Sequence, residues 1–555
     1  MNYHGERRGR GGSILKVTGL FLRVLRGEND TRPSNRYPIA VAAAIAGAMV
    51  ASYYSRLGLT LTHYDTRGHL VVARRIADSI TPGWQQIGAV WLPLPHLLNA
   101  IPVQVDLFYR SGASAVALSV AAFAVATASI ASIVLTLTQS SLAAIAAAAV
   151  FALNPNVLYL QSTPMTEPLL MALTTMGVAM LIEWCLTTPV GAALARPTAQ
   201  LARPDAELFL PTDDSAGPQD NSVAAIGWIF ALACMTRYEA WPITACALTA
   251  AAWTLHRRGT PWAAAWRAAG RIGVYPGVAV LGFIVFSRVV IGQWLVGGEF
   301  YVPENKALND LSMAAAEIGW GTRALSGTLL VWIAGAGIAV LVSVGLGSRR
   351  RAHALIAVTL AATATIPWIA FYKGHPFRIR YMVPLMAMEA VAAGTLAGMF
   401  RRGRVIASCV VLGITAFELR PLDHLAPMVV EAQWDRPNAP VRAKVTACLD
   451  GPGAAGKIMA SMGSLGHYMQ ETSAEGYAIR NFLHEGNGDI WLAALNNPRP
   501  YAEWVLIEEK AEGGDMLARL VRERPAFLAG YARVCEGAGL ALYKRQPLST
   551  IASGK

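Results

Sequence analysis

The side chains that could carry out chemistry gather in four short segments, each beside a long apolar stretch of the chain. They are residues 62–69, 154–167, 236–241 and 372–381. Together these segments combine carboxylates with a concentration of cations. A carboxylate that faces a cationic cluster suits a general base that activates a hydroxyl, beside a pocket that stabilises a departing phosphate.

Two carboxylates are the candidate catalytic groups, Asp65 and Glu167. Asp65 begins a stretch whose apolar residues fall on one side of a predicted helix, so capping of that helix is the structural alternative. Glu167 directly precedes an apolar stretch, where an acid also favours the positive end of a helix. We expect catalysis from Asp65, with Glu167 beside it.

The predicted phosphate-binding side chains lie in the third and fourth segments. Arginine is well matched to phosphate because its planar fork donates two hydrogen bonds at once. A structural ion pair between Arg237 and Glu239 is an equally weighted alternative, and Arg378 and Arg380 could instead anchor the chain at a membrane interface. The candidates are Arg237, Tyr238, Glu239, Lys373, His375, Arg378, Arg380 and Tyr381.

Four further polar residues of these loops are weaker candidates: His69, Arg74, His96 and Gln161. His69 follows Asp65 by one helical turn, so the two side chains share a helix face. That spacing permits a shared divalent cation such as magnesium or manganese, but no third ligand is defined. The metal is therefore left unknown, and no cofactor is certain.

The composition defines the elements that must position these groups. Of the 555 residues, 54% are hydrophobic and only 15% charged, and the mean hydropathy is +0.39. Soluble chains average about 25% charged residues, so the composition indicates a membrane protein. The formal charge of +12 then reflects orientation in the membrane, because lysine and arginine favour cytoplasmic loops. We expect no nucleic-acid partner.

The apolar stretches predict an α-helical polytopic membrane protein with about eleven transmembrane helices. The run over 222–255 would be roughly 51 Å long as one helix, against a hydrocarbon core of about 30 Å, and it carries Arg237 and Glu239 at its centre. We therefore predict two short spans there. The other predicted spans are 38–57, 112–137, 141–159, 166–186, 272–292, 324–347, 354–371, 382–399 and 404–420.

Arginine clusters at 257–271, 349–351 and 401–404 fall on the cytoplasmic side only if the number of spans is odd and the N-terminus is cytoplasmic. This topology puts the first loop, 58–111, and the C-terminal region outside. The transmembrane domain is then 38–420, and it includes a polar cytoplasmic linker over 187–221.

The two ends of the chain differ from this domain. Residues 1–37 form a basic cytoplasmic tail, either a helix on the membrane surface or an unordered segment, and no signal peptide is evident. Residues 421–555 predict a small extracytoplasmic α/β domain, since short apolar runs alternate there with helix-like stretches. Cys448 and Cys535 could pair in that compartment, and two buried free thiols are the alternative.

These features resemble the GT-C superfamily of glycosyltransferases, which use sugars carried on lipid phosphates. The resemblance rests on an acid soon after the first span, a long first external loop, a second acid before the fourth span and an external C-terminal domain. More narrowly, residues 64–70, 91–96, 154–167 and 237–241 are similar to a bacterial branch of the protein-mannosyltransferase-like proteins. The likeness covers the chain to about residue 420 and implies the GT-C fold.

The resemblance implies that Asp65 is the base of an inverting transfer from a polyprenyl-phosphate sugar, with Arg378 and Arg380 near the donor phosphate. The acceptor hydroxyl could belong to a protein, a lipid or a glycan. Several relatives carry an Asp-Glu pair where this chain has Thr166 and Glu167, which weakens the case for a metal. The implied location is the plasma (inner) membrane, with membrane lipid as a further partner.

Two other classes remain open. A transporter or flippase of a lipid-linked or anionic substrate would also bury charges in a bundle, but its site should lie near the membrane midplane between related halves. The polar residues instead gather at one membrane face, and the chain shows no convincing pair of halves. A non-catalytic subunit would leave the segment around Asp65 without special purpose.

Overall fold

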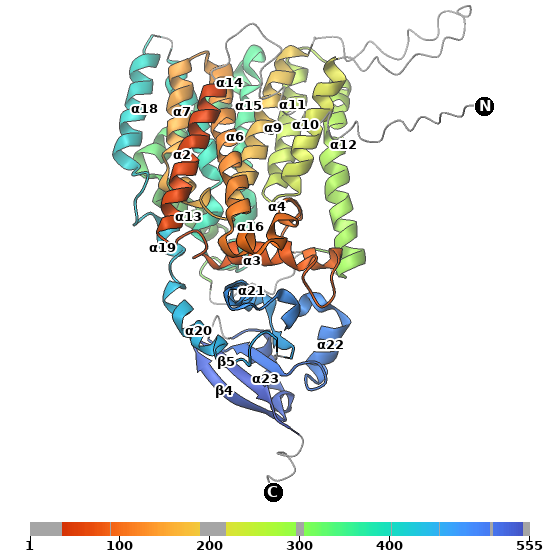
Figure 1. Ribbon diagram of the computed structural model, residues 1–555. Coiled ribbons are helices and arrows are strands. Elements are labelled where there is room, and N and C mark those ends of the chain that lie inside the picture. The colour runs from red at the N-terminus through yellow and green to blue at the C-terminus, as the bar shows by residue number, and fades with distance from the viewer. Residues whose placement is uncertain are drawn as a thin grey trace, which may run out of the picture.

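The computed structural model describes residues 36–88, 90–188, 218–292, 294–295, 305–400, 402–453, 456–510 and 514–547. In these ranges the chain forms a bundle of long helices, and beyond one end of it lies a smaller domain that contains a sheet (Figure 1). The end of the bundle nearest the sheet is called the domain-facing end below. The tail over 1–37 and the linker over 187–221 lie outside the described residues, apart from their edges.

Seven helical segments in the described ranges are long and apolar enough to cross a membrane, so the chain is a multi-pass membrane protein. Some of them are interrupted by a turn of tighter or wider helix. They are α2 (Arg36–Arg56), α6 (Ala113–Thr138), α9 (Glu167–Thr187), α12 (Trp262–Phe286) with η5 (Ser287–Ile291), α14 (Thr328–Gly347), α15 (Ala354–Val358) with η8 (Thr359–Ala364) and α16 (Thr365–Tyr372), and η9 (Ile379–Met382) with α17 (Leu385–Met399).

The other four predicted spans are helical as well, but shorter or less apolar: α7 (Ser141–Ala152), α10 (Pro218–Cys234), α11 (Ala240–Arg257) and α18 (Arg404–Glu418). The total of eleven spans therefore stays a prediction. The break inside 222–255 is confirmed, because α10 ends at Cys234 and α11 begins at Ala240.

Small residues let the helices of the bundle approach closely, as membrane helices require when no hydrophobic effect drives them together. A Cβ atom on Gly337 of α14 would overlap the backbone carbonyl of Ala392 in α17. On another side of α17, a Cβ on Gly394 would overlap Ala147 and lie 2.9 Å from the carbonyl oxygen of Ala143 in α7. Helix α17 is thus held tightly between α14 and α7.

The C-terminal region contains the predicted small α/β domain. Its sheet has the strand order β2-β1-β3-β5-β4. Strand β1 pairs in parallel with β2 and β3, and β5 pairs antiparallel with β3 and β4. The elements are β1 (Ile458–Ala460), β2 (Phe482–Leu483), β3 (Trp504–Glu508), β4 (Tyr531–Gly537), β5 (Leu540–Arg545), α20 (Ala439–Thr446), α21 (Met462–Glu471), α22 (Asp489–Asn496) and α23 (Met516–Glu523).

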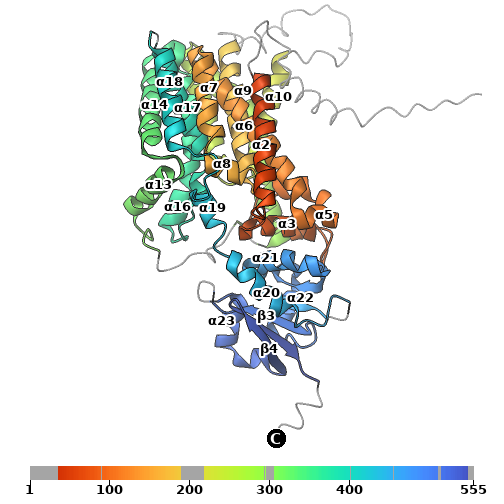
Figure 2. The same cartoon turned by 60° about the vertical axis from the view of Figure 1, so that its left-hand side comes forward.

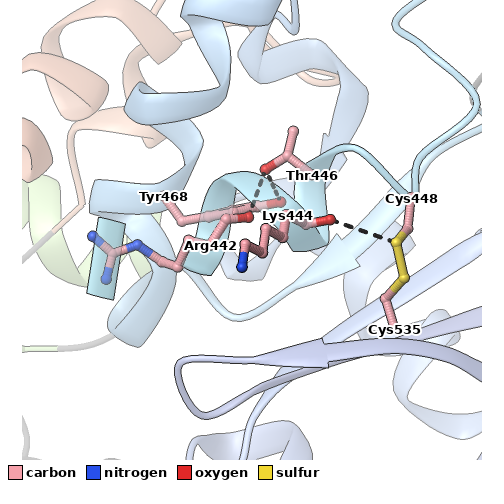
Figure 3. Close-up of a disulfide and its surroundings, with 6 residues drawn as sticks. All are labelled: Arg442, Lys444, Thr446, Cys448, Tyr468 and Cys535. Carbon is pink, nitrogen blue, oxygen red and sulfur yellow. Dashed lines mark hydrogen bonds between the residues drawn. A yellow bond between two sulfur atoms is a disulfide. The ribbon is translucent and has the colours of Figure 1, made fainter. Parts of the chain in front are cut away.

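A disulfide joins Cys448, just after α20, to Cys535 in β4 (Figure 3). The two Cα atoms are 6.5 Å apart, across a sequence separation of 87 residues. Beside it, the Thr446 hydroxyl lies 2.8 Å from the Tyr468 hydroxyl of α21. The pairing of the two cysteines is the one that the sequence left open, and it ties the segment entering the domain to its outer strand.

Short helices fill the domain-facing end of the bundle (Figures 1 and 2). Helix α3 packs against α21 of the sheet domain, so the first loop lies between the bundle and the sheet. These short elements are α3 (Tyr64–Arg75), η1 (Trp84–Ile87), α4 (Leu94–Asn99), η2 (Pro102–Gln104), α5 (Asp106–Ser111), α8 (Pro155–Leu160), α13 (Leu311–Ser326) and α19 (Pro427–Glu431).

Candidate active site

Asp65 lies in the first turn of α3 and is buried. The helix is capped by another residue, His63, whose Nδ1 accepts the backbone N–H of Asp65 at 3.2 Å. Leu70 and Val71 of the same helix are buried in the apolar core that continues into the sheet domain. Because His63 caps the helix, the Asp65 carboxylate is left for a different partner.

That partner is Arg380 of η9, whose Nη1 forms an ion pair with Asp65 Oδ2. Both side chains are more than nine-tenths buried. The Arg380 guanidinium also lies over the ring of Tyr381, 5.1 Å from its centroid. The structure thus joins two predicted site residues from opposite ends of the bundle's sequence in one buried pair.

Glu167 forms a second pair, with Arg237 in the turn between α10 and α11. The distance from Arg237 Nη1 to Glu167 Oε1 is 3.0 Å, and Arg237 Nη2 lies 2.7 Å from Glu239 Oε1. Arg237 also donates to the Thr166 hydroxyl at 3.0 Å. Burial alone would lower the pKa of Arg237, but Glu167 and Glu239 outweigh it and hold that pKa above its usual value.

The two pairs belong to one electrostatic cluster, because Arg380 interacts with both Glu167 and Arg237. Two guanidiniums face three carboxylates within it. The geometry around Arg237 and Glu239 corresponds to the structural ion pair that the sequence offered as an alternative to ligand binding. Tyr238, between them, lies in the same turn, 5.2 Å from the Trp241 ring by centroids.

The segment between α16 and η9 carries the remaining predicted cations. The Tyr381 hydroxyl lies 3.3 Å from His375 Nε2, within hydrogen-bond distance. Arg378 and Arg380 both act electrostatically on the Tyr64 hydroxyl, so Arg378 faces the start of α3. Lys373 is exposed at the end of α16. This segment therefore brings positive charge to the side of the cluster that carries Asp65.

His69 and His96 contact each other and enclose a small cavity. His69 Nδ1 lies 3.1 Å from His96 Nε2, and the Trp91 ring packs on His69. Burial, followed by His96, holds the pKa of His69 well below its usual value, and burial lowers that of His96 to about 3. A cavity of about 20 Å³ beside both rings also touches Ser119 and Thr166, which is space for about one water molecule.

Arg74 and Gln161 make contacts that hold the loops together. Arg74 pairs with Asp78 at 3.1 Å and with Asp106 at 2.7 Å. Gln161 donates to the carbonyl of Gly47 in α2 at 3.1 Å. Their geometry favours structural roles over direct contact with a substrate.

Two residues that adjoin the buried pair, His63 and Glu431, were not among the candidates predicted from the sequence. His63 Nε2 lies 3.5 Å from Glu431 Oε1, and Glu431 Oε2 accepts the Ile379 N–H at 3.3 Å. His63 stands two positions before Asp65, so its place in the same motif was an available signal. Glu431 offered none, because it follows the last predicted span in a segment without a motif.

The residues do not fit the divalent-cation site that the spacing of Asp65 and His69 permitted. In the described ranges, no group of three or more His, Cys, Asp or Glu side chains is arranged to hold a metal ion. Asp65 and Glu167 each face a guanidinium, and His69 faces His96. No chemical step is therefore derived through a metal.

Solved structures of other proteins share this arrangement of the chain. The structure is similar to that of ArnT from Cupriavidus metallidurans in the apo state, with a TM-score of 0.52 and 12% identity over 91% of this chain and 97% of ArnT. The same protein bound to undecaprenyl phosphate gives 0.51 and 12%, over 90% and 97%.

An oligosaccharyltransferase from Archaeoglobus fulgidus, in its apo form, matches with a TM-score of 0.48 and 10% identity, over 86% of this chain and 70% of that one. No protein-family model matches the sequence, and no curated protein matches it. The likeness to ArnT confirms the fold that the sequence resemblance implied: the chain has the GT-C fold.

Proposed function

We propose that the protein is an inverting glycosyltransferase that moves a sugar from a polyprenyl-phosphate donor to an acceptor hydroxyl. The observation that carries the proposal is the buried pair of Asp65 and Arg380 at the domain-facing end of the bundle. A base and a phosphate-binding cation are the two groups this reaction needs. The fold supports it, since one neighbour, ArnT, was crystallised with undecaprenyl phosphate.

The reaction is a single displacement at the anomeric carbon of the sugar. The acceptor oxygen forms a bond to that carbon while its proton passes to Asp65. The bond between the carbon and the donor phosphate oxygen breaks, and the phosphate leaves with the electron pair. Because the attack comes from the face opposite the leaving group, the configuration inverts.

Arg380 has a double role in this proposal. Its guanidinium carries five N–H donors in a fixed fork, so it can contact the donor phosphate and Asp65 together. When the donor phosphate accepts hydrogen bonds from Arg380, the ion pair between Arg380 and Asp65 weakens. The Asp65 carboxylate can then accept a proton. Arg378, which faces the same region, adds positive charge for the leaving phosphate.

The proposed topology follows from the charge distribution. Eleven spans with a cytoplasmic N-terminus put the loop over 58–111 and the domain over 421–555 outside the plasma (inner) membrane. The site then faces the compartment that lacks nucleotide sugars, which explains a lipid-linked donor. The helix ends that carry the arginines of 257–258 and 349–351 are those of α11 and α14 away from the sheet (Figure 1), which supports this orientation.

The test is sugar transfer from a synthetic short-chain polyprenyl-phosphate sugar by the purified protein, with Asp65→Asn as the variant. We expect turnover to fall by about 10²–10⁴-fold, the usual contribution of a positioned acid or base, while the donor still binds. Asp106→Asn is the matched control, because Asp106 lies in the same loop with a half-exposed side chain.

Equal transfer by the wild type and by Asp65→Asn would remove Asp65 from the mechanism. If the wild type transferred sugar from no donor but moved a lipid-linked sugar across vesicles, the proposal would give way to a flippase.

A further inference from the structure

Glu431, the last residue of α19, is a buried carboxylate that accepts one hydrogen bond and faces one histidine ring. It is 8% exposed. Oε1 lies 3.5 Å from His63 Nε2, and Oε2 accepts the backbone N–H of Ile379 at 3.3 Å. His63 stands two residues before Asp65, and Ile379 stands directly before Arg380. One carboxylate therefore contacts a residue close in sequence to each member of the Asp65–Arg380 pair.

The contact with His63 places the carboxylate beside the ring that caps α3. Nδ1 accepts the Asp65 N–H at 3.2 Å, so it carries no proton. A neutral imidazole then has its proton on Nε2, the nitrogen that faces Glu431. A partner on one ring nitrogen sets the state of the other, and Glu431 favours the tautomer in which His63 can cap α3.

The contact with Ile379 fixes the second member of the pair. Ile379 begins η9, and the next residue is Arg380. The N–H groups at the start of a helix have no partner within it. By accepting the Ile379 N–H, the Glu431 carboxylate fixes the position of the first residue of η9. Once that turn is placed, the Arg380 guanidinium reaches Asp65 Oδ2.

Glu431 is itself held in place by the second loop. The backbone N–H of Met428, at the start of α19, donates to Asn156 Oδ1 at 3.0 Å. Asn156 in turn donates to the Leu325 carbonyl in α13 at 2.8 Å. These hydrogen bonds fix the position of α19. The Glu431 carboxylate therefore connects segments that are distant in sequence.

We infer that Glu431 is a positioning residue, which sets the geometry of the Asp65–Arg380 pair through His63 and Ile379 without touching the substrate. The inference rests on the proposed function, because it assigns to that pair the work of base and phosphate ligand. Misplacing a reacting group by about 1 Å can cost about 10²-fold in rate, so the effect of Glu431 should appear in kcat.

The first experiment compares Glu431→Ala and Glu431→Gln in the transfer assay. We expect Glu431→Ala to lower kcat by about 10–100-fold and to change KM for the donor by less than about 3-fold. Glu431→Gln should recover most of the loss, because an amide oxygen can still accept from Ile379 and an amide still fills the space beside His63. A variant that lost its donor affinity while keeping kcat would contradict a positioning role.

Glu418→Ala is the matched control. Glu418 also accepts two backbone N–H groups at the domain-facing end, from Leu329 and Leu330, each at 2.8 Å. Neither of these hydrogen bonds involves the Asp65–Arg380 pair. Its loss should lower thermal stability and leave kcat per folded molecule unchanged. Equal losses of kcat in Glu418→Ala and Glu431→Ala would reduce Glu431 to a purely structural residue.

A second readout does not depend on turnover. Nitrogen NMR of the protein labelled with ¹⁵N-histidine reports which ring nitrogen carries the proton, and His63→Gln identifies the His63 signals. We expect the Nε2 signal of His63 to shift further from its wild-type position in Glu431→Ala than in Glu431→Gln, because only the alanine variant removes the oxygen that faces this nitrogen. An unchanged Nε2 signal in Glu431→Ala would overturn the inference. If the wild type transferred no sugar, the proposed function would fail. The NMR result would still decide whether Glu431 acts on His63.

Discussion

At the scale of single residues, the charge balance supports our proposal for the place of the donor phosphate. Arg237 is paired with both Glu167 and Glu239, so it has little positive charge to offer an anion. Arg380 faces the single carboxylate of Asp65. A phosphate should therefore approach from the segment over 372–381, which adds Lys373 and Arg378, rather than from the turn over 236–241.

Replacing Arg380 with lysine tests this distinction between charge and shape. Lysine keeps the charge but loses the planar fork that can contact a carboxylate and a phosphate together. We expect kcat/KM for the donor to fall by about 10–100-fold, a loss of roughly 1.4–2.7 kcal/mol in transition-state binding, measured with varied donor.

Arg323→Lys on α13 is the control, because Arg323 donates to a carbonyl of its own helix, that of Gly319 at 3.3 Å. Full activity in Arg380→Lys would show that charge alone suffices at this position.

The candidate site could be predicted in part from residue types. Asp65 and Arg380 were both candidates, because each stands in a polar segment beside an apolar span. Their contact was not predictable, since loops from distant parts of the chain meet only once the helices have packed. Glu431 could not be predicted for the same reason, because its proposed role depends on contacts with two residues that are remote in sequence.

At the scale of helices, close approach between α14 and α17 depends on Gly337. A Cβ there would overlap the backbone of Ala392, whereas a Cβ on Gly335, in the same helix, would meet nothing within 4 Å. We expect Gly337→Ala to lower the apparent melting temperature in detergent, since overpacking costs typically about 1–3 kcal/mol.

Gly335→Ala should leave the melting temperature equal or raise it slightly, because alanine favours the helix. Similar losses in both variants would mean that the helices adjust without cost.

Helix positions were more predictable than the short elements between them. The apolar stretches predicted the long helices, and charged residues inside 222–255 predicted the break between α10 and α11. Helix α13 (Leu311–Ser326) was not anticipated, because it mixes apolar side chains with Glu317 and Arg323. Such a segment is too polar to predict a span, and its place at the domain-facing end (Figure 2) comes from packing.

At the scale of the whole molecule, the first loop and the sheet domain are joined through polar contacts. Asp78 pairs with Arg480 at 2.7 Å, and Gln470 donates to the Tyr109 carbonyl at 3.1 Å. Arg75 of α3 acts on His96 in the loop and on His484 in the sheet domain. Burial, followed by Arg75, lowers the pKa of each histidine to about 3.

From the lowered pKa values of these two histidines we predict that acid destabilises the folded protein. An unfolded histidine takes up its proton near pH 6.5, whereas the folded ones stay neutral down to about pH 3. Unfolding therefore takes up protons in that interval, so stability is complete above pH 6.5 and falls by about 1.4 kcal/mol per pH unit for each histidine below it.

The measurement is the apparent melting temperature between pH 7.5 and pH 5. His484→Gln should weaken the dependence of the melting temperature on pH, because it removes one of the buried histidines whose pKa is lowered. A wild-type melting temperature independent of pH in this range would contradict the assignment.

The pairing of Asp65 with a residue more distant along the chain has a consequence for biosynthesis. Asp65 is translated before Arg380, Glu431 and the sheet domain. Domains fold as units while a chain is being synthesised. A chain that stops before residue 380 therefore displays the Asp65 carboxylate without its counterion, and the buried pair forms only after Arg380 has been made.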